Sequence, residues 1–166
     1  MTDSIDPRTP GPVLGQLIGV PFGFLGRIGY TGLVGFGRDL SWTVPGSSDT
    51  ATGSELALHI ECPFRIVQHG RIFVGSDDMV PTRRGNPPKG EDERLQFDTG
   101  AEALQEYLDR MAPKVLTVER APEGDLRIMM EHGIRVDILP TSSKRKESWR
   151  FLVRFGEHVV FPPSEN

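Results

Sequence analysis

An apolar side chain at every second position along two distant segments is the feature that most constrains the fold of this chain. The segments are Glu55–Cys62 and Trp149–Phe155. Their apolar members are Leu56, Leu58, Ile60 and Cys62 in the first, and Trp149, Phe151, Val153 and Phe155 in the second. Successive side chains of an extended chain point to opposite faces, so a period of two predicts half-buried β-strands. We expect their apolar members to meet in one core.

Further strands are predicted on both sides of a single helix. Pro63 interrupts the first segment, and a hairpin follows, with strands Phe64–Val67 and Arg71–Val74 joined by a turn at Gln68-His69-Gly70. Later strands are predicted at Val115–Arg120, Leu126–Met130, Ile134–Ile138 and His158–Phe161. These elements predict an α+β fold made predominantly of antiparallel β-meanders.

The one predicted helix covers Asp98–Ala112. Thr99 and Glu102 have the spacing of a capping box, which satisfies backbone N–H groups at a helix start. Apolar residues then recur at helical spacing, and Pro113 stops the pattern.

Two parts of the sequence echo each other. Phe64-Arg65-Ile66-Val67 precedes Gly70 and an apolar run, as Trp149-Arg150-Phe151-Leu152 precedes Gly156 and another. Each block also follows an alternating strand. An internal duplication, with two related meanders about a pseudo-twofold axis, would explain the echo. Chance similarity between short aromatic strands would explain it equally well.

The chain is expected to form one domain. We predict an N-terminal flexible arm over residues 1–12, a single α+β domain over 13–162 and a tail over 163–166. Glycines recur every three or four residues from Gly11 to Gly35, and we interpret them as bends and close approaches in two short strands. Long polar loops are predicted at Arg38–Ser54, with Pro45–Gly53 as its flexible part, and at Gly75–Leu95.

Composition narrows the class of protein. The 166 residues carry a formal charge of −4, which argues against a nucleic-acid partner because such binders usually need a basic excess. The apolar stretch Val13–Phe36 is interrupted by Pro21, glycines and Arg27, so we expect no membrane span. One cysteine and no signal-peptide pattern fit a cytoplasmic protein.

No catalytic, metal-binding or cofactor-binding motif is predicted. His59-Ile60-Glu61 matches half of a zinc deaminase signature, but the cysteine pair of the other half is absent because Cys62 is alone. Cys62 as a nucleophile would need a neighbouring base, and its apolar-face position favours an inert thiol.

Five residues are candidates for contact with a ligand or partner. His59 is predicted on the polar face of its strand, and Asp77 and Asp78 on a loop where carboxylates could bind a cation or remain solvated. Arg65 and Arg150 each follow an aromatic residue in the two echoing blocks. These arginines could join the two halves or face a ligand.

A resemblance adds an expectation. The run Leu58–Ile66 (LHIECPFRI), continuing through Gly70–Gly75 to Asp77, resembles the L-H-[IV]-x-C-P-W-R-[IL] signature of small, uncharacterised, actinobacterial-type domains. Ile138–Ser143 with Trp149-Arg150-Phe151 resembles a second signature of this group. The likeness covers about Val13–Phe161, and Phe64 replaces the usual Trp. The group is similar in style to immunity and accessory proteins of bacterial competition loci, and the resemblance implies no catalytic residues.

Two classes of function follow. The first is a non-enzymatic binding protein, immunity-like or accessory in type, whose partner is another protein; its oligomeric state is not specified by the sequence. The second is a small enzyme or ligand-binding protein that uses His59, Glu61, Asp77 and Asp78 in one cleft.

Overall fold

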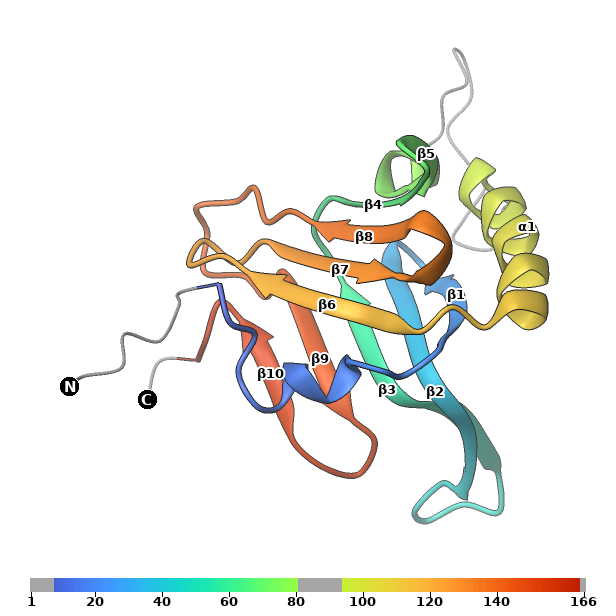
Figure 1. The fold of residues 1–166 in the computed structure, drawn as a ribbon. Coiled ribbons are helices and arrows are strands. Elements are labelled where there is room, and N and C mark those ends of the chain that lie inside the picture. Colours follow the sequence, from blue (N-terminus) through green and yellow to red (C-terminus); the bar gives the residue numbers. More distant parts are fainter. Residues whose placement is uncertain (1–7, 81–93, 165–166) are drawn as a thin grey trace, which may run out of the picture.

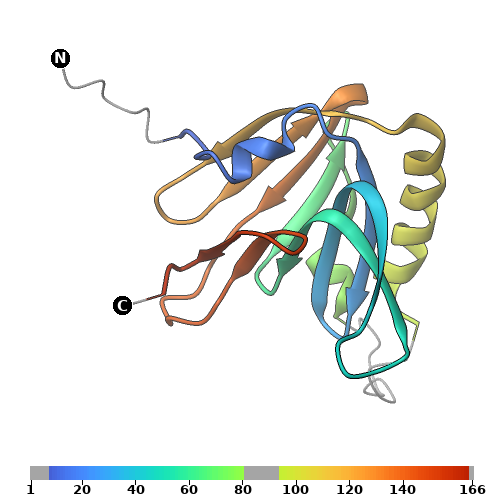
Figure 2. The ribbon, with the colours of Figure 1, turned by 90° about the horizontal axis from the view of Figure 1, so that it is seen from below.

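A computed structural model describes residues 8–80 and 94–164, and it shows two five-stranded antiparallel sheets that face each other (Figure 1). Helix α1 (Gln96–Met111) lies at one end of the two sheets, and both termini leave at the opposite end (Figures 1 and 2). The strands are β1 (Phe22–Ile28), β2 (Thr31–Thr43), β3 (Thr50–Ile60), β4 (Phe64–Gln68), β5 (Arg71–Gly75), β6 (Val115–Arg120), β7 (Leu126–Met130), β8 (Ile134–Ile138), β9 (Trp149–Val153) and β10 (His158–Phe161). The predicted α+β class with antiparallel meanders is confirmed.

The two sheets have the same topology. Sheet I has the order β1-β2-β3-β9-β10, and sheet II has the order β6-β7-β8-β4-β5. Each half of the chain therefore supplies a three-stranded meander to one sheet and the following hairpin to the other. This arrangement corrects one detail of the prediction, because the chain passes from sheet I to sheet II at Pro63 instead of continuing one meander.

Hydrogen bonds and register repeat between the halves as well. Phe22 N–H donates to the Pro113 carbonyl at 2.8 Å, and Val115 N–H donates to the Val20 carbonyl at 3.0 Å, so residues 20–22 and 113–115 pair reciprocally. β1 has a register shift just after Phe22, and β6 has one just after Val115. β-Bulges are conserved within protein families, so bulges at matching places indicate related halves. The geometry therefore supports the pseudo-twofold arrangement that the sequence echo predicts.

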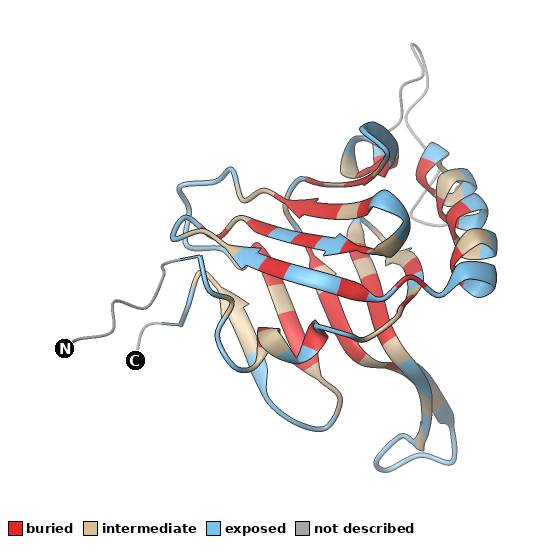
Figure 3. Cartoon of the chain, in the orientation of Figure 1, coloured by how far each residue is buried: buried red, intermediate tan, exposed pale blue. Residues whose placement is uncertain are grey.

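The core lies between the two sheets. Buried residues line the strands of both sheets and one side of α1 (Figure 3). The predicted core members Leu56, Leu58, Ile60, Trp149 and Phe151 are all buried.

Two expectations are wrong, and a third is met only in part. Alternation predicts Phe155 in the core, yet it follows β9 in a turn, and its side chain is 74% exposed. Cys62 packs against the core as expected, but it lies beyond the end of β3 and is only half-buried. The expected loop Arg38–Ser54 is mostly the long hairpin of β2 and β3, in which only residues 44–49 form the connection.

The helix has a different start from the predicted one. α1 begins at Gln96, and Asp98 Oδ2 accepts a hydrogen bond from Leu95 N–H at 2.8 Å. Glu102 instead pairs with Arg94, so the Thr99–Glu102 capping box does not form. Asp98 occupies the third position of the helix, from which its carboxylate reaches back to the Leu95 N–H.

Helix α1 covers the free edge of β1. The Gln105 side-chain amide donates to the Gly23 carbonyl at 2.7 Å, and its oxygen accepts from Leu25 N–H at 3.4 Å. Covering an edge in this way removes backbone groups that could pair with another chain. No helix among residues 8–80 and 94–164 has the length and apolarity needed to cross a membrane.

Candidate functional site: a groove on the outer face of sheet I

The outer face of sheet I contains an apolar groove of about 580 Å³. This volume falls in the range of sites that bind small molecules or a few side chains of a partner. Its lining residues come from β1, β2, β3 and the end of β9, and they are Phe24, Ile28, Leu33, Val34, Gly35, Asp39, Trp42, Thr52, Gly53, Ser54, Ala57, His59 and Arg154.

Small residues form the floor of the groove. Gly35 lies opposite Ala57 in the β2–β3 register, and a Cβ on Gly35 would overlap the Ser54 side chain and lie 3.0 Å from Phe24 Cβ. Ser54 and Phe24 pack directly over Gly35, and the short side chains of Ser54 and Ala57 line the groove there. Phe24 and Leu33 stand beside the floor and make the wall apolar.

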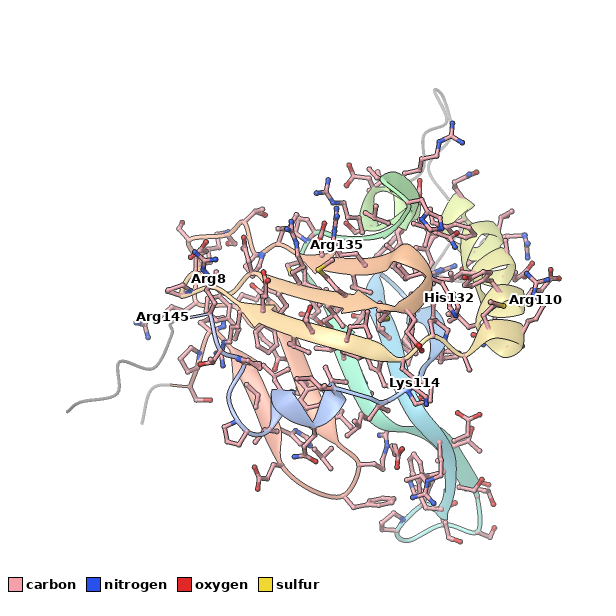
Figure 4. The ribbon with its side chains drawn as sticks, viewed as in Figure 1. Arg8, Arg110, Lys114, His132, Arg135 and Arg145 are labelled. Carbon is pink, nitrogen blue, oxygen red and sulfur yellow. The ribbon has the colours of Figure 1, made fainter. Side chains whose placement is uncertain are left out.

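On the corresponding face of sheet II, charged side chains occupy positions that are apolar in the groove. Asp137 is 1% exposed and accepts hydrogen bonds from Arg65 at 2.9 Å, Arg127 at 3.2 Å and Arg135 at 3.0 Å. Arg135 is one of several basic side chains on the side of the molecule shown in Figure 4, which also labels Arg8 and Arg145 at one end and Arg110 at the other. Buried carboxylates require such partners.

Strand register allows the two faces to be compared position by position. In sheet II, Asp137 lies opposite Arg65 and Arg127. At the corresponding place in sheet I, His59 lies opposite Arg150 and Leu33.

A second pair of positions corresponds in the same way. Arg135 lies opposite Val67 and Met129 in sheet II, and Ala57 lies opposite Leu152 and Gly35 in sheet I. Sheet I thus has an imidazole where sheet II has the central carboxylate. It also has Leu33 and Ala57 where sheet II has two arginines.

One end of the groove is lined by Arg154 and Trp42, and the Phe155 ring packs against Trp42. The Arg154 guanidinium lies 4.9 Å from the centre of the Trp42 ring, and its Nε donates to the Ser54 carbonyl at 3.1 Å. The Phe155 ring contacts Trp42 edge-on, with ring centroids 5.3 Å apart. Phe155 has φ 62°, a backbone conformation that is unfavourable for a bulky residue. An exposed aromatic side chain is therefore held in a strained turn beside the groove.

Arg154 has no carboxylate partner within ion-pair distance among the described residues. Burial lowers the pKa of its guanidinium. A partly desolvated cation without an anion lacks the compensation that other buried charges receive. Asp39 also lines the groove, but it is exposed and lies on the rim.

His59 and Arg150, two of the predicted contact residues, are brought together. They lie opposite each other in the β3–β9 register. Burial, followed by the charges of Arg154 and Arg150, lowers the pKa of His59, which favours the neutral imidazole at pH 7. Arg150 itself binds Glu147 at 2.8 Å and contacts His158 Nδ1 at 2.9 Å.

The remaining predicted residues lie elsewhere. Arg65 binds Asp137 in sheet II, so it joins the two halves of the chain, which is the first of the two predicted roles. Asp78 accepts from Gly75 N–H at 2.9 Å within the short 3₁₀ helix Ser76–Met79, and the neighbouring Asp77 is exposed. Glu61 is exposed beyond the end of β3. The groove therefore contains His59 without Glu61, Asp77 or Asp78.

Neither a reactive thiol nor a metal cluster is found at these positions. Burial raises the pKa of the Cys62 thiol to about 11, so it is protonated at neutral pH. Among residues 8–80 and 94–164, His, Cys, Asp and Glu side chains form no group of three suited to a metal ion.

A second, smaller pocket of about 350 Å³ lies at the β6–β7 turn. Its charged lining mixes both signs, with Arg8, Arg120 and Arg127 beside Glu119, Glu123, Asp125 and Asp137. Burial and the nearby charges of Glu123 and Asp137 raise the pKa of Asp125. The mixed charges give this pocket no clear preference for one ligand class.

Comparisons of the chain with protein-family models, with curated proteins and with solved structures found no match. The geometry of the groove therefore carries the functional argument.

Sequence reasoning identified one groove residue, His59, and missed Arg154, Trp42 and Leu33. The missed residues come from strand segments far apart in the chain. The only available signal was the polar position of Arg154 in the alternating segment, which does not separate it from Arg150.

Proposed function

We propose that this protein is a non-enzymatic binding module and that the groove on the outer face of sheet I receives an extended segment of a partner protein. The supporting observation is the contrast between two faces with the same strand register. One has an aspartate and three arginines at its centre, whereas the other is mainly apolar and forms the larger groove at the corresponding positions.

Exposed apolar surface next to charged groups is typical of protein-binding sites. Phe24 is 41% exposed, and Ile28 is 72% exposed on the same strand. With Phe155 and Trp42 at the other end, the groove has aromatic groups of the kind that dominate binding energy at interfaces. An immunity-like or accessory role in bacterial competition is a prediction from the resemblance alone.

Sheet II suggests a variant that fills the groove with charged side chains, because the same residues already occur at the corresponding positions of sheet II. The triple variant Leu33→Arg, Ala57→Arg, His59→Asp copies the residues at the corresponding positions of sheet II. Its new aspartate would lie opposite Arg150, as Asp137 lies opposite Arg65. Met129→Arg, which adds an arginine to the exposed face of sheet II, is the matched control.

The test is selection of random displayed peptides on the immobilised wild-type protein. We expect enriched peptides with apolar residues that bind the wild type and Met129→Arg but lose binding to the triple variant. Circular dichroism checks that the triple variant folds. If the triple variant does not fold, the single variant Ala57→Arg is used in its place. Absence of enriched peptides, or equal binding to the closed groove, would overturn the proposal.

A further inference from the structure

We propose that the groove selects segments with an acidic side chain next to an apolar one, and that Arg154 binds the carboxylate. This inference rests on the proposed function and specifies the chemistry of the partner. The argument starts from the position of Arg154, whose guanidinium lies at the end of an otherwise mainly apolar lining.

The Arg154 guanidinium is positioned rather than free. Its Nε donates a hydrogen bond to the Ser54 carbonyl, and the guanidinium stacks on the Trp42 ring. A guanidinium held in this way keeps further N–H donors for a ligand, since arginine has five. A planar donor set suits a carboxylate, and its partial desolvation strengthens the interaction.

The absence of a side chain at Gly53 leaves room for the Arg154 guanidinium and the Trp42 ring. A Cβ at Gly53 would lie 2.7 Å from Arg154 Nη2 and 3.2 Å from the Trp42 ring. The arginine and the tryptophan therefore lie directly over a strand position without a side chain. Gly53→Ala should displace Arg154 while leaving its charge unchanged.

Other cations around sheet I already have anionic partners. Arg38 pairs with Glu55 at 3.4 Å, and Arg150 pairs with Glu147 at 2.8 Å. Charge complementarity thus assigns the acidic group of a partner to Arg154. The apolar neighbour of that group would contact Trp42 and Phe155.

The test compares three capped peptides by NMR titration of the labelled, full-length protein. The probes are Ac-Leu-Glu-Phe-NH₂, its neutral isostere Ac-Leu-Gln-Phe-NH₂, and Ac-Leu-Gln-Phe-OH, which carries only a terminal carboxylate. We expect the Glu peptide to shift groove amides and to bind about tenfold more tightly than the Gln amide, as for a charge-assisted hydrogen bond. The preference should fall at high salt.

Variants identify the responsible residue. Arg154→Gln and Gly53→Ala should both reduce the preference for the Glu peptide, whereas Arg38→Gln, which removes the same charge from the exposed part of β2, should retain it. A preference that survives Arg154→Gln overturns the inference, and so does equal groove binding of the Glu and Gln amides. A stronger response to the terminal carboxylate also overturns the assignment to an acidic side chain.

The two proposals fail separately. Groove binding without an acid preference rejects the role of Arg154 and leaves the binding module intact. Absence of groove shifts with all three probes in the millimolar range rejects the acid site, while the displayed-peptide selection decides the proposed function independently.

Discussion

Replacing Trp149 with phenylalanine tests the packing on which both sheets depend. The Trp149 side chain is fully buried, stacks on Phe161 with ring centroids 6.0 Å apart, and donates from Nε1 to the Gly124 carbonyl at 2.8 Å. Its counterpart in sheet II is Phe64, so a phenyl ring already occupies the corresponding position of this fold.

The expected loss in the free energy of unfolding has two parts. Removing the indole N–H leaves the buried Gly124 carbonyl without this donor, which costs about 1–3 kcal/mol. The smaller ring leaves part of the site empty and costs about 1 kcal/mol more, since complete removal in Trp149→Ala costs about 3–5 kcal/mol. The total of about 2–4 kcal/mol is large beside a typical stability of about 5–15 kcal/mol.

The assay is urea denaturation followed by far-UV circular dichroism, which does not depend on tryptophan fluorescence. We expect the midpoint for Trp149→Phe to fall by about 1–2 M at an unchanged slope. Trp42→Phe is the control, because Trp42 is only half-buried on the outer face. A midpoint shift for Trp149→Phe no larger than that of the control would refute the packing argument.

Three further predictions address the charges and the covered edge. Asp137→Asn should destabilise the protein by about 2–3 kcal/mol in urea titrations, because three arginines lose their shared carboxylate while remaining partly exposed; an unchanged midpoint would contradict this. Gln105→Ala should cost about 1 kcal/mol and speed amide exchange at Leu25, unless the β1 edge is protected without this side chain. The pKa of His59 is lowered in the folded state, so the unfolded chain binds more protons, and stability falls as pH drops below about 6.5 towards the folded pKa. Stability should therefore fall less steeply with pH in His59→Gln than in the wild type. Parallel stability–pH curves for the two proteins would rule this out.

Much of the fold could be predicted because strand formation leaves a local signal. Alternation placed the five strands from β6 to β10 within a residue or two of their observed bounds. The helix prediction began two residues late, because Asp98 rather than Thr99 provides the capping interaction. The polar residues of Arg38–Ser54 hid a hairpin, since hydrogen bonding across two exposed strands needs no apolar pattern.

Alternating side-chain character by itself determined which residues of β3 and β9 face the core, because the two faces of a strand differ in exposure to water. The sequence echo left duplication and chance equally open, and the repeated topology and register of the two sheets are seen only in the structure. Only the tertiary structure decided that the chain changes sheets at Pro63, that Asp137 gathers three arginines, and that Arg154 meets Trp42 at the end of a groove. Apart from the Arg135–Asp137 contact within β8, these contacts join residues 10 to 112 positions apart and depend on which strands become neighbours. No local pattern in the chain encodes that choice, because it follows from the packing of the whole core.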